Sequence, residues 1–297
     1  MQEKLGAELI DGEPPQGDKI VLDPVYPFLT KERLDGLLEM YQGSFSFEGG
    51  YVVRGGAAGA RLGRIEQGLF SIADYPQILT RAAKENAAYW AERGALIEEG
   101  AIVSSLARLA EGVMIERGAR LLGKSVIETN AHIGADSEII DSVIGEGSEI
   151  RCSIIEHSQI GRSCKIGPFA YLRPNSVVGD HCRVGDFVEL KNCRFGTGSK
   201  AAHLSYIGDA EVGERVNIGC GVVFANYNGK TKSQSTVGDD SFIGSNCNLI
   251  APVSVGEGSY LAAGTTLTKD LADGDFCIGR CRETIKERRA KNYLGKK

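Results

Sequence analysis

Large aliphatic residues recur at every sixth position along the middle of this chain. The first run has eight members without a gap, at Ile97, Val103, Leu109, Ile115, Leu121, Ile127, Ile133 and Ile139. After a slip near Ile144 and Ile150, a second run comprises Ile154, Ile160, Ile166, Leu172, Val178, Val184 and Leu190, and a third comprises Val237, Ile243, Leu249, Val255, Leu261 and Leu267. Neither an α-helix nor an ordinary strand repeats with this period.

A small or β-branched residue stands four positions after each aliphatic residue of the first run. These residues are Ala101, Ala107, Val113, Ala119, Ser125, Ala131, Ser137 and Val143. Such a hexapeptide repeat is typical of a parallel β-helix, in which each hexapeptide makes a short strand and a corner, and three of them close one triangular coil. We therefore predict a mainly β protein with about ten coils of roughly eighteen residues.

Residues 1–96 do not share this period. They contain turns rich in glycine and proline, a helix expected from Lys31 to Tyr41 with Thr30 as its N-cap, and a second helix expected from about Pro76 to Arg93. We predict three parts: a small α/β cap with a linker helix over residues 1–96, the β-helix over 97–271, and a basic tail over 272–297.

The composition favours regular tight corners over disorder. The chain has 39 glycines and only 8 prolines among 297 residues, and this glycine content is well above the usual ~7%. Its net charge of −5 argues against a general nucleic-acid binder, which normally has a basic face. There is no long apolar stretch and no signal-peptide pattern, so we expect a cytoplasmic protein that binds neither nucleic acid nor membrane.

The cysteines do not predict a metal site. None of the 8 cysteines forms a CxxC pair, and Cys164, Cys182 and Cys247 fall on the small interior position of the repeat. We interpret them as packing residues in a reducing compartment, and we expect no bound metal.

The period breaks at two places. Leu190 and Ile207 are seventeen residues apart, one short of three hexapeptides, whereas Phe224 and Val237 are thirteen apart, one more than two. The polar residues in these segments include Lys191, His203, Tyr206, Asn226, Tyr227 and Lys232. Functional residues often lie where a rigid scaffold departs from regularity, so we predict the site there.

The region from Gly167 to about Arg280 carries the words GPFAYLRPNS, FVELKN, HLSYIGDAEVGERVNIGCG, NYNGKTK and GSNCNLIAPVSVG. In these words and their order it closely resembles the acetyltransferase half of the bifunctional N-acetylglucosamine-1-phosphate uridyltransferase and glucosamine-1-phosphate acetyltransferase family. The resemblance implies a left-handed β-helix, acetyl transfer from acetyl-coenzyme A (acetyl-CoA) to glucosamine 1-phosphate, and a homotrimer with sites between neighbouring subunits.

Carried over to matching positions, the resemblance implies that His203 is the general base and that Glu189 orients it. Asn226 and Ser245 would stabilise the thioester oxygen as it gains charge. The implied contacts to the sugar phosphate are Arg173, Lys191, Tyr206, Asn217 and Lys232. The implied contacts to the coenzyme are Cys220, Asn226, Tyr227, Ser245, Ala263 and Arg280, with no metal required.

Residues 1–96 resemble only late parts of the family's nucleotidyltransferase domain, in DPVYPFLTKERLDGLLE and the helix from Pro76. We therefore expect no uridylyltransferase activity and no need for magnesium. Two alternatives stay open. The acceptor could be galactosamine 1-phosphate or another amino sugar, or the protein could be a non-catalytic trimer that binds a sugar nucleotide or a regulatory partner.

Overall fold

The computed structural model describes residues 87–104 and 106–290 with their side chains, and residues 19–22, 45–47 and 50–53 as strands. The chain divides into two units, Met1–Asn86 and Ala87–Lys297. The helix predicted from Lys31 to Tyr41 lies outside the described residues. Of the helix predicted from Pro76 to Arg93, only residues 87–91 are described as helical.

The described part of the first unit is a three-stranded antiparallel sheet. Its strands are β1 (Lys19–Leu22), β2 (Phe45–Phe47) and β3 (Gly50–Val53). The order is β1-β3-β2, so β3 is central. Lys19 of β1 is in register with Val53 of β3, and Phe45 of β2 with Val52.

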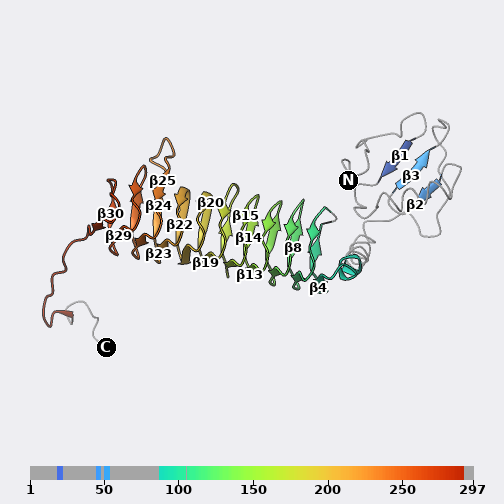
Figure 1. The fold of residues 1–297 in the computed structure, drawn as a ribbon, viewed down its shortest axis with the longest axis horizontal. Coiled ribbons are helices and arrows are strands. Elements are labelled where there is room, and N and C mark those ends of the chain that lie inside the picture. The colour runs from blue at the N-terminus through green and yellow to red at the C-terminus, as the bar shows by residue number, and fades with distance from the viewer. Residues whose placement is uncertain (1–18, 23–44, 48–49, 54–86, 105, 291–297) are drawn as a thin grey trace. The chain divides into compact units, whose positions relative to one another are not determined.

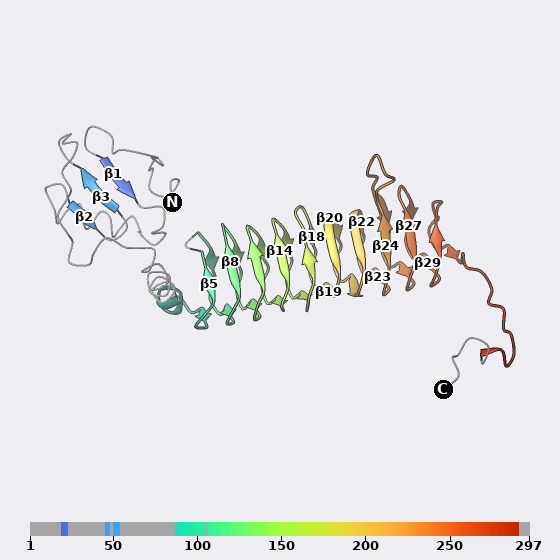
Figure 2. The same cartoon turned by 180° about the vertical axis from the view of Figure 1, so that it is seen from behind.

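The second unit is a left-handed parallel β-helix of about ten coils, which confirms the predicted fold (Figures 1 and 2). One face is an eleven-stranded parallel sheet. Its strands are β4 (Leu96–Ile97), β7 (Met114–Ile115), β10 (His132–Ile133), β13 (Glu149–Ile150), β16 (Lys165–Ile166), β19 (Arg183–Asp186), β21 (Lys200–His203), β23 (Asn217–Ile218), β26 (Phe242–Ile243), β29 (Tyr260–Leu261) and β31 (Phe276–Cys277).

The other strands belong to one seventeen-stranded sheet. They are β5 (Ile102–Val103), β6 (Arg108–Leu109), β8 (Arg120–Leu122), β9 (Val126–Ile127), β11 (Glu138–Ile140), β12 (Val143–Ile144), β14 (Ile154–Glu156), β15 (Gln159–Ile160), β17 (Tyr171–Leu172), β18 (Val177–Val178), β20 (Glu189–Phe195), β22 (Tyr206–Val212), β24 (Val223–Ala225), β25 (Ser235–Val237), β27 (Asn248–Ile250), β28 (Ser254–Val255) and β30 (Thr266–Leu267). The strand β20 pairs with both β17 and β18, so it continues from one face to the next.

The aliphatic column predicted from the repeat forms the core, with one correction. Ile139, Ile144, Ile150 and Ile155 are all fully buried, whereas Ile154, which the second run included, is 41% exposed. The spacing from Ile139 to Ile144 and from Ile150 to Ile155 is five residues, because the corner between the strands is one residue shorter. The predicted register is regained at Ile160, which is buried.

Several small interior positions satisfy their own polar groups, whereas the buried hydroxyls of Ser137 and Ser235 have no hydrogen-bond partner among the described residues. Ser148, Cys164, Cys182 and Ser199 lie on successive coils, and each donates a hydrogen bond to a backbone carbonyl on the next coil at 2.7–3.0 Å. Together with Cys247, the cysteines predicted to pack inside are buried and unbridged. Their thiols therefore fill the column and replace the serine hydroxyl as donors.

Within residues 87–104 and 106–290, no helix is both long and apolar enough to span a membrane. The same residues hold no group of three or more His, Cys, Asp and Glu side chains arranged to bind a metal ion.

Candidate active site

The first break in the period is a short step in the core. Leu190 and Phe195 are both buried, and they lie five residues apart on β20. The next core residues, Ala201 and Ile207, follow at the regular spacing of six. In this segment β20 and β22 pair in register over their whole length, which sets Glu189 beside Tyr206 and Lys191 beside Gly208.

The second break is a loop that projects from the prism between β24 and β25 (Figure 1). It leaves the coil at Asn226, whose carbonyl accepts a hydrogen bond from the backbone N–H of Ser233 at 2.8 Å. A bridge between Tyr227 and Lys232 closes it as a small hairpin. This hairpin loop, which leaves the coil at the polar residue Asn226, therefore accounts for the thirteen-residue spacing.

The imidazole of His203 is paired with Asp186. The two residues are register partners on β21 and β19, and the distance from Nδ1 to the carboxylate Oδ1 is 2.6 Å. The hydrogen bond from His203 holds the pKa of Asp186 below its ordinary value. A charged carboxylate can only accept, so this bond requires a hydrogen on Nδ1, and the lone pair of the neutral imidazole is then on Nε2.

Glu189 does not hold His203, contrary to the sequence-based expectation. Its Oε1 accepts a hydrogen bond from Arg173 at 2.8 Å, and this bond raises the pKa of the arginine. The physical reason is register: side chains in a β-helix stack on the equivalent positions of neighbouring coils. Glu189 is level with Tyr206 rather than with His203, so Glu189 orients a cation instead of the imidazole.

A third carboxylate, Asp209 on β22, lies among amides and ammonium groups. Its oxygens accept hydrogen bonds from Nδ2 of Asn192 at 2.8 Å and from Nδ2 of Asn226 at 2.5 Å. The Lys191 Nζ is 3.9 Å from its Oδ2. The amide of Asn226 also donates to the hydroxyl of Tyr206 at 3.3 Å. Both hydrogens of Asn226 Nδ2 are therefore used, which leaves its amide oxygen, and not the expected donor, for a ligand.

The charges in this cluster influence one another. Burial raises the pKa of Asp209, but the hydrogen bonds from Asn192 and Asn226 and the charges of Lys191 and Lys232 outweigh it, so the net pKa is lowered. The neighbouring ammonium of Lys191 lowers the pKa of Lys232. Two like charges held so close disfavour each other, so this pair is suited to binding an anion.

The residues expected to contact the coenzyme lie on later coils, toward the carboxyl end. Arg280 donates to the backbone carbonyl of Ala263 at 2.6 Å. Tyr227 is 59% exposed, Cys220 is exposed and Ser245 is half-buried. Asn217, expected to contact the sugar, is half-buried on β23 between Lys200 and Phe242.

Among the fully described residues, hydrogen bonds between side chains join part of the predicted site into three groups. The first is His203 with Asp186, the second is Arg173 with Glu189, and the third is the Asp209 cluster. Asp186 and Asp209 were missed from the sequence. Asp186 stands seventeen residues before His203, so counting back one short coil from the histidine would have found it.

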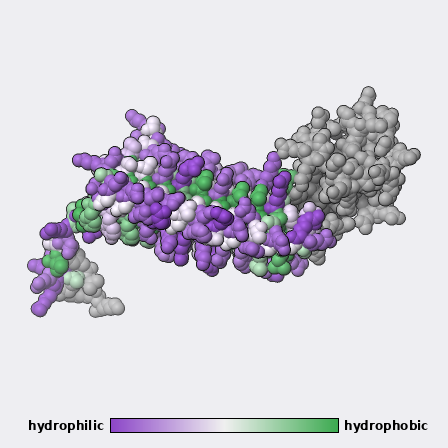
Figure 3. All heavy atoms as spheres, viewed as in Figure 1, coloured by the Kyte–Doolittle hydropathy of each residue, from purple (hydrophilic) through white to green (hydrophobic). Residues whose placement is uncertain are grey.

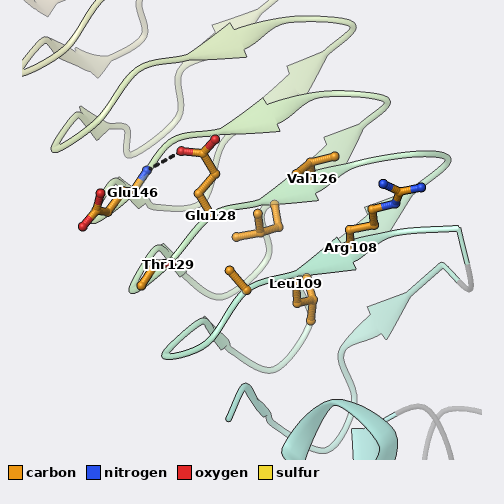
Figure 4. Close-up of a pocket in the computed structure, with 8 residues that line it drawn as sticks. Arg108, Leu109, Val126, Glu128, Thr129 and Glu146 are labelled. Carbon is orange, nitrogen blue, oxygen red and sulfur yellow. Dashed lines mark hydrogen bonds between the residues drawn. The ribbon is translucent and has the colours of Figure 1, made fainter. Parts of the chain in front are cut away.

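A separate open pocket of about 290 Å³ lies near the first coils. Its lining residues are Arg108, Leu109, Ala110, Val126, Ile127, Glu128, Thr129 and Glu146. The backbone N–H of Glu146 donates to Oε2 of Glu128 at 3.1 Å across it (Figure 4). None of the predicted site residues contributes to this pocket, so it has no part in the proposed chemistry.

Two family models match the β-helix. One, described as bacterial transferase hexapeptide (six repeats), matches residues 157–192. The other, described as hexapeptide repeat of succinyl-transferase, matches residues 235–269. These matches agree with the stacked parallel coils, so the second unit is a β-helix built from hexapeptide repeats.

The chain is similar to the proteins named bifunctional protein GlmU. The one from Clostridioides difficile is 51% identical over 185 residues, which are 62% of this chain and 40% of the relative. The one from Halalkalibacterium halodurans is 41% identical over 229 residues, which are 76% of this chain and 49% of the relative. The chain thus spans less than half the length of these relatives, and the predicted resemblance to one half of a bifunctional protein is confirmed.

Among solved structures, the UDP-N-acetylglucosamine acyltransferase from Campylobacter jejuni is 19% identical, with a TM-score of 0.29 over 62% of this chain and 71% of that chain. A score this low supports no argument about the activity of the present chain.

Proposed function

We propose that this chain is an N-acetyltransferase that moves the acetyl group of acetyl-CoA to the amine of an amino-sugar 1-phosphate, with glucosamine 1-phosphate as the expected acceptor. The observation that carries the proposal is the pairing of His203 with Asp186. His203 stands three residues before Tyr206, which begins the strand that also carries Asp209. A polarised base and a pair of neighbouring ammonium groups suit an acceptor that carries both an amine and a phosphate. The similarity to GlmU supports the same chemistry.

In the proposed reaction, Nε2 of His203 is the base. The neutral form of the amine attacks, because an ammonium has no lone pair, and an imidazole can take the proton that the nitrogen loses as the C–N bond forms. The amine nitrogen attacks the thioester carbonyl carbon, the new C–N bond forms and the C–S bond breaks. The amine proton passes to Nε2 and then to the departing thiolate, so coenzyme A leaves as the free thiol.

The cationic residues would hold the phosphate. Lys191 and Lys232 supply two neighbouring ammonium groups, and a dianion between them would relieve their repulsion. Arg173 is oriented by Glu189 through one terminal nitrogen, which leaves the rest of its donor fork for a phosphate or a sugar oxygen. These local charges make an anion site compatible with the net negative charge of the chain.

The coenzyme would lie along the corners that carry Cys220, Ser245 and Ala263. Because both amide hydrogens of Asn226 are used internally, we assign the stabilisation of the thioester oxygen to the Ser245 hydroxyl. One such donor is commonly worth ~3–4 kcal/mol in the transition state. Arg280, held over Ala263, would meet a nucleotide phosphate.

We also propose that the protein self-associates, as a homotrimer, through the corner beside the His203–Asp186 pair. Phe169, Phe187 and Leu204 follow one another on successive coils there, and they are 54%, 60% and 58% exposed. All three have positive φ, of 59°, 56° and 46°, a conformation that bulky residues rarely adopt. Figure 3 shows that apolar patches interrupt the largely hydrophilic surface of the prism. Such patches favour a protein interface.

The decisive experiment measures thiol release from acetyl-CoA with glucosamine 1-phosphate for the wild type and for His203→Ala. We expect turnover by the wild type and a loss of ~10²–10⁴-fold in the variant, with an unchanged circular dichroism spectrum. Full turnover by folded His203→Ala would reject the assigned base.

Two further measurements separate the alternatives. Galactosamine 1-phosphate, assayed at the same concentration, tests the choice of acceptor. Calorimetry with acetyl-CoA tests the non-catalytic alternative, because a protein that binds no coenzyme at millimolar concentration is not this transferase.

A further inference from the structure

The Asp209 carboxylate is the most connected side chain of the candidate site. It is 14% exposed and lies 3.9 Å from Lys191. Its two oxygens take separate amide donors, Oδ1 from Asn192 at 2.8 Å and Oδ2 from Asn226 at 2.5 Å. A charge buried to this extent is retained only when it is paired or hydrogen-bonded, and here both conditions are met.

This arrangement determines which way round the amide of Asn226 lies. A carboxylate has no hydrogen to donate, so only the NH2 group of the amide can face Asp209. The second amide hydrogen goes to the hydroxyl of Tyr206 at 3.3 Å. Among residues 87–104 and 106–290, the recorded hydrogen bonds include none to the amide oxygen of Asn226, a side chain that is only 8% exposed.

An amide oxygen held in this way is an acceptor for an N–H group of a bound amine. Accepting one N–H fixes the direction of the nitrogen lone pair, and correct orientation is a large part of the rate of a bimolecular reaction. If the amide were reversed, its NH2 group would meet the amine and misdirect it. The orientation of Asn226 therefore bears on catalysis, and Asp209 determines it.

We propose that Asp209 is a positioning residue that fixes the amide oxygen of Asn226 toward the acceptor amine and holds Lys191 beside the phosphate. The proposal rests on the acetyl-transfer function proposed above. In this proposal Asp209 touches no substrate itself. It helps to orient the nucleophile through Asn226 and helps to bind the anion through Lys191.

The kinetic test compares Asp209→Asn with the wild type. The variant has one oxygen in place of two, so Asn192 and Asn226 compete for it. We expect kcat to fall by ~10²-fold, the size of effect that a misplaced reactant produces, and KM for the sugar phosphate to rise. Asp240→Asn is the matched control, because Asp240 pairs with Arg215 at the surface, and it should leave both constants unchanged.

A rescue experiment distinguishes positioning from general damage. In Asp209→Asn combined with Asn192→Ala, the competitor is gone and the remaining oxygen can again accept from Asn226. We expect kcat to recover severalfold, while KM stays raised because the charge beside Lys191 is still missing. An unchanged kcat and KM in the single variant, or no recovery in the double variant, would overturn the proposal.

A stability cycle tests the same contact without any activity. Asn226→Asp places two carboxylates against each other and should lower the melting temperature at pH 7.5, and adding Asp209→Asn should restore it. Additive effects in this cycle would refute the contact itself. If the cycle couples but the wild type acetylates no amino-sugar phosphate, the proposed function fails while the orientation of Asn226 stands.

Discussion

At the scale of single residues, the site uses a different carboxylate for each of its working groups. Asp186 holds His203, Glu189 holds Arg173 and Asp209 holds the amide of Asn226. Each pair joins neighbouring coils or neighbouring strands, so the scaffold sets which acid meets which partner. Removing one acid should therefore disturb one function and spare the others.

The first prediction contrasts Asp186→Asn with Glu189→Gln. The Asp186 change removes the charge that fixes the tautomer of His203, so kcat should fall, at most by the ~10²–10⁴-fold that a general base contributes. The Glu189 change loosens Arg173, so KM for the acceptor should rise with little effect on kcat. Steady-state kinetics with varied acceptor separate the two. Equal effects on kcat from both variants would contradict the assignment.

The second prediction concerns Gly208, which makes room for Tyr206. A Cβ built on Gly208 would overlap the phenol hydroxyl and ring of Tyr206. Gly208→Ala should therefore displace the ring, weaken its hydrogen bond with Asn226 and lower kcat/KM. Gly229→Ala is a useful control for added bulk, since nothing lies within 4 Å of its Cβ position, although its φ of +93° adds local strain. Unchanged kinetics in Gly208→Ala would show that the position of the ring does not matter.

A residue of the candidate site could be predicted from the sequence when it lies in a family motif, but not when it acts through a contact with another coil. His203, Arg173 and Lys191 stand in sequence motifs that the family shares, so the resemblance proposes them as site residues. Asp186 and Asp209 act by stacking on another coil, and that relation depends on the number of residues per coil. The resemblance assigned Glu189 as the partner of His203, whereas in the structure His203 is hydrogen-bonded to Asp186 and Glu189 to Arg173.

At the scale of elements, the short step at Leu190–Phe195 places a large side chain in the core. Phe195 is 1% exposed and occupies a position that is aliphatic on most coils. Its ring therefore fills more of the interior than an aliphatic side chain would. The same segment carries the pairing of β20 with β22 that aligns the site.

The third prediction is that Phe195→Ala destabilises the β-helix by ~3–5 kcal/mol, the usual cost of deleting a buried aromatic ring. Urea unfolding monitored by circular dichroism provides the measurement. Phe276→Ala is the control, because Phe276 is 65% exposed and its loss opens no cavity. A cost below that of the control would mean that the short step does not depend on the ring.

The strands themselves followed from the sequence almost completely. The six-residue period fixes which side chains face inward, and the three runs are buried as expected apart from Ile154, which is exposed, and Ile97 on the first coil, which is half-buried. The prediction for Ile154 was wrong because either of two adjacent isoleucines could be the core residue after the shorter corner. Both Ile154 and Ile155 satisfy the hydrophobic pattern, and only the length of the corner decides between them.

At the scale of the whole molecule, the exposed apolar corner is the feature that an isolated chain does not explain. Phe169 and Phe187 stack on each other with centroids 5.6 Å apart, and yet both remain exposed. Phe187 directly follows β19, and Leu204 directly follows β21. A neighbouring subunit would cover these apolar residues and enclose the His203–Asp186 pair.

The fourth prediction is that Phe187→Asp prevents self-association. A charge in an apolar interface lacks a partner and costs several kcal/mol, so trimers should dissociate to monomers. Light scattering coupled to size-exclusion chromatography measures the mass. Phe276→Asp, an equally exposed ring on a different part of the prism, should leave the mass unchanged. Trimers that persist in Phe187→Asp would place the interface elsewhere.

The steps of five residues among steps of six have a consequence for how such a chain can evolve. In a flat sheet, one extra or missing residue turns every following side chain to the opposite face. Here the corner takes up the change, and the next isoleucine still points to the axis. A corner can therefore gain or lose one residue while the core side chains stay buried. Such a change alters which polar side chains of neighbouring coils lie beside each other.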